Sequence, residues 1–293
     1  MSMDLSRQIL DANKRSFAAQ AAKYDQYEVC FSPRARKGLL KDIQYIVDNV
    51  SPTNCQTNQA FQADIDSRPT ILDCGAGTGN IGLEFLKSGF KVVGVDLSAE
   101  MLDIFYQKAL KLDQQSNLLE LINQDIDSFL LSNRNCFDVV VCSSFLHHLP
   151  KYLPVVNELC DRVNPGGFLY IAWEPLPKSN RTILQKLFVK TDNFVNLILH
   201  DPLSIISIPL NMIRGIGRVN ERATKKIELV DYHIPTGLNV GEIIKCIEEG
   251  KLEIVALKNF AGRRVNIFQS LAEHYHFHDH FSVIAKRTKE IQV

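Results

Sequence analysis

The sequence predicts an α/β fold in which a mostly parallel sheet carries helices on both of its faces. From Thr70 onward, short apolar runs alternate with stretches of helix-like length, and the runs are continuously apolar, as in strands buried on both faces. A chain of 293 residues, with 45% apolar and 23% charged residues, is long enough for one such domain that carries an insertion.

Two helices are predicted before the sheet, over residues 4–24 and 33–50. In the second helix, Leu39, Ile43, Ile46 and Val47 repeat at helical spacing. Residues 51–69 are polar and aperiodic, which predicts a mobile linker. We therefore expect an N-terminal helical segment at residues 1–50, joined to the core by that linker.

Seven strands are predicted, over residues 70–74, 91–96, 118–125, 137–144, 167–174, 252–257 and 280–287. Helices are predicted near residues 79–89, 98–111, 126–132, 150–163 and 239–249. Because only a loop is expected between the last two strands, we expect them to pair antiparallel at one end of the sheet. Residues 176–230 are mostly helix-like but interrupted by proline and glycine. We expect them to form a helical cap inserted into a core of residues 70–175 and 231–293.

The segment that links the first strand to a helix is rich in glycine. Glycines there permit a tight turn and let a ligand contact the backbone. Gly77, Gly79 and Gly82 fit a dinucleotide fingerprint, which would bind NAD. The alternative pattern is an acid, Asp73, followed by glycine at every second position from Gly75. Because an acid at the strand end would repel a pyrophosphate but attract the cationic end of S-adenosylmethionine, we favour the second cofactor.

Polar side chains also end the next three strands. Asp96 ends the second strand, where an acid can accept from ribose hydroxyls. Asp125 ends the third, where a carboxylate can reach an adenine amino group while Ile126 packs on the ring. Ser143 and Ser144 end the fourth, at the edge where open α/β sheets bind ligands. Each acid alone would be explained as a helix N-cap, but three acids at three strand ends favour a cofactor site.

With these motifs, the sequence resembles the class I (Rossmann-like) S-adenosylmethionine-dependent methyltransferases of the small-molecule type, such as those of ubiquinone biosynthesis and natural products. The matching segments are LDCGAGTGNIG (72–82), VGVDLSAEML (93–102), NQDID (123–127), FDVVVCSSFLHHLP (137–150) and NPGGFLYIAWEP (164–175). The resemblance implies a Rossmann-like fold, S-adenosylmethionine as cofactor and S-adenosylhomocysteine as its product.

The resemblance also implies a set of cofactor contacts and a lid. The methionine portion would lie at Asp73 and at Gly75, Ala76, Gly77 and Gly79, the ribose at Asp96, the adenine at Leu97, Met101, Gln124, Asp125 and Ile126, and further contacts would come from Ser143 and Tyr24. The opening helices, with Phe17, Tyr24 and Asp25, resemble the lid of these enzymes. Tyr24 would then bond the cofactor carboxylate, or only pack its helix.

Candidate catalytic residues follow the fourth and fifth strands. His147 and His148 follow the fourth strand, and the ordinary pKa of imidazole suits proton removal near neutrality. Glu174 closes the fifth strand, where it could orient a histidine or accept a proton. The alternative is that one histidine packs under the next helix and the other is solvated. Trp173 and His233 are candidate substrate contacts, with Trp173 more as a wall than as a reactant.

The inserted cap combines apolar and basic residues. Residues 183–213 are densely apolar, which predicts an enclosed pocket for a medium-sized, fairly apolar acceptor. Residues 178–230 carry nine Lys and Arg against four Asp and Glu. That order is consistent with weak docking to a membrane surface, which would collect a lipid-like acceptor. We favour the alternative, a cap whose basic face is only solvated.

Composition excludes several classes of function. The 33 basic residues balance the 33 acidic residues, so no global charge favours nucleic acid. Seven cysteines without a CxxC pair predict neither a disulfide framework nor a zinc knuckle. The first residues lack a signal pattern and no run is apolar enough to span a membrane, so we expect a cytoplasmic protein. In residues 274–280 histidines alternate and would share one face of a strand, but we expect no metal there.

The sequence thus predicts a methyltransferase that acts on a small, fairly apolar acceptor, with oxygen the favoured atom and carbon or nitrogen next. Two alternatives stay open. One is a protein of the same fold that binds the cofactor as a partner or sensor without turnover. The other is an NAD-dependent oxidoreductase.

Overall fold

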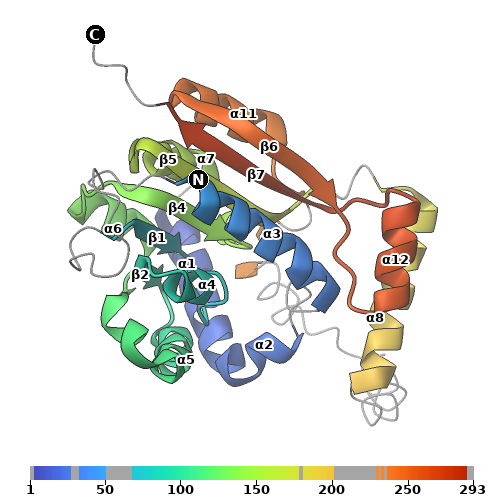
Figure 1. The fold of residues 1–293 in the computed structure, drawn as a ribbon. Coiled ribbons are helices and arrows are strands. Elements are labelled where there is room, and N and C mark those ends of the chain that lie inside the picture. The colour runs from blue at the N-terminus through green and yellow to red at the C-terminus, as the bar shows by residue number, and fades with distance from the viewer. Residues whose placement is uncertain are drawn as a thin grey trace.

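The computed structural model describes residues 3–27, 33–50, 68–177, 181–200, 229–230, 232–233 and 236–288. In this part of the chain a seven-stranded sheet runs through the molecule, with the strand order β3-β2-β1-β4-β5-β7-β6 (Figure 1). Residues 51–67 of the expected linker and residues 178–180 and 201–228 of the expected cap lie outside the described residues. The linker and the cap therefore stay predictions.

The strands are β1 (Thr70–Cys74), β2 (Lys91–Asp96), β3 (Leu119–Asn123), β4 (Phe137–Ser143), β5 (Val163–Pro175), β6 (Leu252–Phe260) and β7 (His280–Arg287). Strands β1 to β5 run parallel, whereas β7 is antiparallel to both β5 and β6. The seven predicted strands and the antiparallel pairing of the last two are confirmed. β5 begins four residues earlier than predicted, since Val163 already pairs with Phe137 ahead of an irregularity in the ladder.

The helices are α1 (Met3–Gln20), α2 (Tyr24–Tyr27), α3 (Pro33–Asn49), α4 (Gly82–Lys87), α5 (Ala99–Ala109), α6 (Ile126–Ser132), α7 (Tyr152–Asp161), α8 (Ile183–His200), α11 (Val240–Glu249) and α12 (Asn266–His274), with short 3-10 turns η1 (Ala21–Lys23), η4 (Leu110–Leu118) and η5 (Leu146–His148). The helices predicted around the sheet are present. α12 lies where only a loop was expected.

The interpretation of the alternating histidines as one strand is wrong. His274 ends α12, and residues 275–279 form the turn that follows it. Only His280 lies in a strand, as the first residue of β7. The imidazoles therefore do not share one face of a strand.

The central strands are mostly apolar because both of their faces are covered. Leu72 and Val140 belong to the core beneath α6, α7 and α11. Ile71 and Val139, their neighbours in sequence, belong to the core beneath α3, α4 and α5. Successive side chains of a strand point to opposite faces, so a strand between two helical layers carries apolar residues on both faces.

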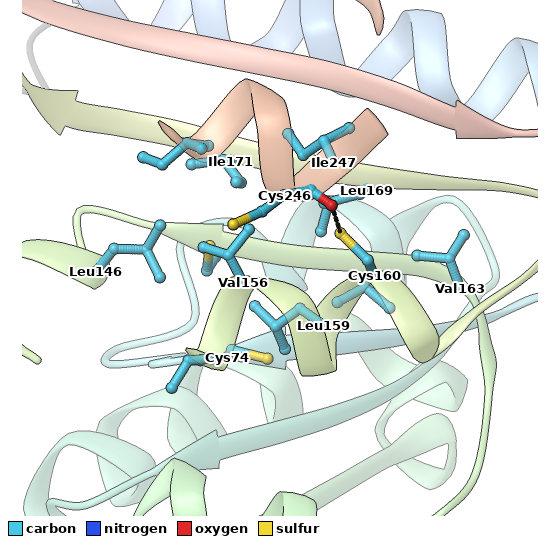
Figure 2. Close-up of a cluster of buried hydrophobic side chains, with 14 of the residues drawn as sticks. Cys74, Leu146, Val156, Leu159, Cys160, Val163, Leu169, Ile171, Cys246 and Ile247 are labelled. Atoms are coloured by element: carbon cyan, nitrogen blue, oxygen red, sulfur yellow. Dashed lines mark hydrogen bonds between the residues drawn. The ribbon is translucent and has the colours of Figure 1, made fainter. Parts of the chain in front are cut away.

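Figure 2 shows the first of these cores, in which side chains of α7 and α11 lie against those of β5. Its three labelled cysteines, Cys74, Cys160 and Cys246, are buried and free. Burial raises the pKa of the Cys160 thiol to about 12. Thiols kept protonated in this way are packing groups without nucleophilic character.

The carboxyl ends of the parallel strands gather the polar segments at one edge of the sheet. The glycine loop follows β1, and the turn that contains η5 follows β4. β7 starts at the same edge, because it is antiparallel and His280 pairs with Pro175 at the end of β5. This is the edge at which open α/β sheets bind their ligands.

α8 lies beside α12 at one side of the molecule (Figure 1). Its exposed residues include Ile183, Leu187 and Phe194, and its two lysines, Lys186 and Lys190, are exposed as well. Among the described helices, none is both long and apolar enough to cross a bilayer. For the inserted segment, the solvated face that the sequence favours and the alternative of membrane contact both stay predictions.

Candidate functional site

The loop after β1 bends through backbone conformations that favour glycine. Gly75 has φ +69° and Gly79 has φ +81°. A Cβ on Gly75 would lie 2.2 Å from Cδ2 of Phe145, and one on Gly79 would lie 2.1 Å from Cδ2 of Phe105. A Cβ on Gly77 would meet nothing nearer than 4.0 Å. The loop is thus packed tightly at two glycines and open beside the third.

Two of the three predicted acids hold this loop through backbone amides. Oδ2 of Asp73 accepts from the amide of Gly82, 3.0 Å away. Oδ2 of Asp96 accepts from the amide of Gly77, and its Oδ1 accepts from the amide of Ser98, both at 2.8 Å. Each carboxylate oxygen has a second lone pair, so both acids can still accept from a ligand.

The third acid is a helix cap that also faces a cavity. Oδ1 of Asp125 accepts from the amide of Ser128 at 2.9 Å and so caps α6. The helix-cap explanation therefore holds for Asp125. The same residue lines the larger of the two cavities described below, so the cap and a ligand contact do not exclude each other.

Asp73 carries a raised pKa. Burial, opposed by the hydrogen bond from the Gly82 amide and assisted by the charge of Asp96, raises the pKa of its carboxyl to about 7. A carboxyl in this state exchanges a proton near neutral pH. A cationic ligand group nearby would favour the ionised form.

Two cavities adjoin at Gly75, which lines both. The larger has a volume of about 400 Å³ and lies between α1, the ends of β2 and β3, and the turn after β4. The smaller has a volume of about 50 Å³ and lies between the glycine loop, α2, α3 and the end of β4. An elongated ligand would occupy both and pass over Gly75.

Most of the predicted cofactor contacts line these cavities. Gly75, Asp96, Leu97, Gln124, Asp125 and Ile126 line the larger one, and Tyr24, Asp73, Gly75, Ala76, Gly77 and Ser143 line the smaller one. Met101 and Gly79 are set apart from them. Met101 is buried, and its amide donates to the Ser98 hydroxyl at the start of α5. Gly79 packs against Phe105.

The first two helices cover the two cavities. Ile9, Asn13 and Phe17 of α1 lie at four-residue spacing, hence on one helix face, and line the larger cavity. On α2, Tyr24 lines the smaller cavity. Both helices thus lie against the cavities, and the lid itself stays a prediction.

Asp25 fastens α2 to the glycine loop. Its Oδ1 accepts from the hydroxyl of Thr78 at 2.5 Å and from Nδ2 of Asn80 at 3.1 Å. Lys108 of α5 pairs with the same carboxylate and also donates to the carbonyl of Thr78 at 2.9 Å. Burial raises the pKa of Asp25, but Lys108 and the two hydrogen bonds outweigh it and hold that pKa below its usual value.

Glu174 organises the turn after β4. Its Oε1 accepts from the amides of Phe145 and Leu146, both at 2.8 Å. Its Oε2 lies 2.9 Å from Nδ1 of His147 and accepts from the His147 amide at 3.3 Å. The carboxyl is fully buried. Of the two roles expected for Glu174, this geometry fits the orientation of a histidine.

His148 faces the larger cavity with a defined tautomer. Its Nδ1 lies 2.7 Å from the carbonyl of Val230. A carbonyl only accepts, so Nδ1 carries the proton and Nε2 keeps a lone pair. Burial lowers the pKa of His148 well below 6.5, and the nearby His147 lowers it further. A neutral imidazole with a free Nε2 is the form that a general base requires.

Strained backbone marks the ends of β4 and β5. Ser144 has φ +51° and Trp173 has φ +58°, although neither is glycine. Such conformations persist where the surroundings impose them, and they are frequent at functional sites. Trp173 is buried, with its ring 4.7 Å from Phe260 and 5.7 Å from His280 between centroids. Trp173 is therefore a packing residue at this edge of the sheet.

His233 contacts the turn that carries the catalytic candidates. Its amide donates to the carbonyl of His147 at 3.0 Å, and its ring stands against Tyr152. Burial lowers the pKa of His233. Its Nε2 is buried and has no partner in the described part of the chain.

Three residues of the site were not singled out from the sequence. Phe145 lines the larger cavity and packs on Gly75, and its position directly after Ser143 and Ser144 was the available signal. Asn13 of α1 contacts the turn after β4, at a sequence separation of 135 residues. Lys108 lies on α5 without any local motif. Only the fold brings Asn13 and Lys108 to the site.

Comparison with known proteins gives the site a context. Residues 71–167 match the model of a family described as a methyltransferase domain. A ubiquinone biosynthesis O-methyltransferase of Aliivibrio fischeri (strain MJ11) is 30% identical over 118 residues, which cover 40% of this chain and 47% of that protein. This chain therefore spans about half the length of the curated relatives it matches.

Solved structures extend the likeness to the whole fold. Magnesium protoporphyrin IX methyltransferase from Synechocystis PCC 6803, solved with bound SAM, is 13% identical with a TM-score of 0.53, and the match covers 96% of this chain and 97% of that one. The N-methyltransferase NodS from Bradyrhizobium japonicum WM9 is 12% identical with a TM-score of 0.54, over 94% and 99% of the two chains. At such low identity these matches establish the fold.

Proposed function

We propose that this chain, which belongs to the class I S-adenosylmethionine-dependent methyltransferases, transfers a methyl group from S-adenosylmethionine to a small, fairly apolar organic acceptor. One observation carries the proposal. Two cavities adjoin at Gly75, and acids from the ends of β1, β2 and β3 line them, with the neutral His148 beside them.

The residues present fit the cofactor. Asp96 and Asp125 line the larger cavity, where Asp96 would accept from the ribose hydroxyls and Asp125 from the adenine amino group. In the smaller cavity, Asp73 and the open side of Gly77 suit the charged methionine portion. The raised pKa of Asp73 fits a site where a cation settles beside it. When bound, the cofactor supplies a methyl group activated by a positively charged sulfur.

The protein would contribute alignment, water exclusion and proton removal. α1 and α2 cover the two cavities and so exclude water. His148 would take the proton of an acceptor hydroxyl at its free Nε2 as the oxygen becomes methylated. Glu174 and His147 would hold the turn that carries His148 and so fix the position of the base.

Oxygen is the favoured acceptor atom, with carbon or nitrogen next. The partly matching relative is named for O-methylation in ubiquinone biosynthesis, whereas the structural neighbour NodS is named as an N-methyltransferase. A free imidazole supports oxygen, because a hydroxyl acceptor must lose its proton. We propose a phenol or a similar hydroxyl compound with an apolar body.

The first experiment separates this proposal from its rivals. S-adenosylhomocysteine, but not NAD, should raise the melting temperature, and methyl transfer from labelled S-adenosylmethionine should occur with at least one member of a panel of phenols, catechols and amines. Stabilisation by NAD would indicate the oxidoreductase instead. Cofactor binding without any product across the panel would indicate a partner or sensor protein.

The partner and the location follow from the same reasoning. We propose a small-molecule acceptor and no nucleic acid, because the chain has no net charge. The cysteines that the structure describes are all free, which suits a reducing compartment, and we propose the cytoplasm.

A further inference from the structure

Asn13 is a buried polar residue of α1. Its side chain is 7% exposed and lines the larger cavity. Ser6 and Arg7 of α1 also line this cavity, but the two residues one turn from Asn13 on either side, Ile9 and Phe17, are apolar. An amide in such a place requires an explanation, because burying a polar group without partners is unfavourable.

The orientation of the amide is fixed by one hydrogen bond. Nδ2 of Asn13 donates to the carbonyl of His148 at 3.1 Å. The flipped orientation would place two oxygens against each other, since a carbonyl cannot donate. The carbonyl oxygen of the Asn13 side chain is therefore the atom left over.

That oxygen, Oδ1, is buried and has no hydrogen-bond partner in the described part of the chain. A buried acceptor left unpaired loses its bonds to water without replacement. Asp96 and Asp125 on the cavity wall accept hydrogen bonds from backbone amides, and neither donates one to Oδ1. A ligand that donates a hydrogen would satisfy it.

We propose that Oδ1 of Asn13 accepts a hydrogen bond from the adenosine portion of the bound cofactor, from a ribose hydroxyl or from the adenine amino group. The inference rests on the proposed function, because it assigns a contact within the same cavity. In this proposal, α1 binds the nucleoside as well as covering the larger cavity.

The same amide connects the ligand to the catalytic turn. Nδ2 holds the backbone of His148, whose ring also stands 5.0 Å from that of Phe17 between centroids. A hydrogen bond from the nucleoside to Oδ1 would therefore stabilise the contact between α1 and the turn that carries His148, the proposed general base. Cofactor occupancy and the position of His148 are then coupled through one side chain.

The test is calorimetric titration of S-adenosylhomocysteine and of adenosine analogues into wild type, Asn13→Leu and Asn13→Ser. The analogues are purine riboside, which lacks the amino group, and the deoxyadenosines that lack one ribose hydroxyl each. Asn13→Leu should weaken binding of S-adenosylhomocysteine by about tenfold. One analogue lacks the group that donates to Oδ1 of Asn13. Wild type and Asn13→Leu should bind that analogue with equal affinity.

The analogue that shows this equality identifies the donor as the amino group or a hydroxyl. Equal binding of S-adenosylhomocysteine by wild type and both variants would overturn the inference. If Asn13→Leu fails to fold, the smaller Asn13→Ser decides the same comparison. Failure of wild type to bind S-adenosylhomocysteine would instead refute the proposed function, so the two failures are distinguishable.

Discussion

Glu174 and His147 are joined side chain to side chain, with Oε2 2.9 Å from Nδ1, although they follow different strands. The same carboxylate accepts from three backbone amides of the turn after β4. The pair thus ties the end of β5 to the turn that carries the proposed base.

Replacement of Glu174 should destabilise the protein. Glu174→Ala leaves three buried amides and the His147 ring without their acceptor, so we expect the free energy of unfolding to fall by about 3 kcal/mol. Urea denaturation measures this change. Glu249→Ala, which removes an exposed partner of Lys245, is the matched control and should change little. Equal effects of the two variants would contradict the assigned role.

The raised pKa of Asp73 predicts a proton linked to folding and to binding. Its pKa rises from 3.8 to about 7 in the folded protein, so the folded state holds a proton that the unfolded chain has released. The stability that this group contributes is present below pH 3.8 and is lost as the pH rises through about 7. Chemical denaturation across this range should show the loss, and Asp73→Asn should remove it.

The same carboxyl should release its proton when a cation binds beside it. Near pH 7, binding of S-adenosylmethionine should release roughly half a proton. Titration calorimetry in buffers with different ionisation enthalpies counts that proton, and S-adenosylhomocysteine, which lacks the sulfonium charge, should release less. If both ligands released the same fraction of a proton, Asp73 would not lie beside the sulfur.

His148 should affect turnover more than cofactor affinity. Removal of a general base lowers the rate by roughly a hundredfold or more, so His148→Ala should lower kcat to that extent while the Kd of S-adenosylhomocysteine stays close to that of wild type. Because the pKa of His148 lies well below 6.5, kcat should not fall as the pH drops to 6.5. Full activity of both His147→Ala and His148→Ala would make the imidazoles structural.

Much of this site could be predicted because it lies at strand ends. Asp73, Asp96 and Asp125 each terminate an apolar run, and parallel strands bring their carboxyl ends to one edge whatever the remaining details. Local sequence therefore predicted both the strands and the acids. The helix over residues 33–50 followed from apolar spacing in the same way.

The remaining contacts could not be predicted because they depend on packing between distant segments. Glu174 bonds to the turn after β4 just beyond an irregularity in the pairing of β5 with β7, between Ile171 and Glu174, which no local pattern encodes. α12 is an exception, because Ile267, Phe268, Leu271 and Ala272 repeat at helical spacing and could have indicated this helix. The bond from Asn13 to His148 joins a helix to a turn more than a hundred residues away.

The exposed apolar residues of α8 favour contact with a membrane surface over the solvated face that the sequence alone favoured. Leu187 is 60% exposed beside two exposed lysines, a pattern typical of helices that lie on anionic bilayers. The protein should float with vesicles of phosphatidylglycerol and phosphatidylcholine, and Leu187→Asp should weaken that binding. Leu131→Asp, at a residue that is 74% exposed on α6, should leave it unchanged. Equal flotation of wild type and Leu187→Asp would leave α8 as a solvated helix.

The most direct measurement is calorimetric titration of S-adenosylhomocysteine into wild type and Asp96→Ala. The proposed site predicts one-to-one binding by wild type and a loss of about 1–3 kcal/mol in Asp96→Ala, because the ribose hydroxyls lose their acceptor. Absence of binding heat with wild type, or an unchanged affinity in Asp96→Ala, would contradict the assignment of these cavities to the cofactor.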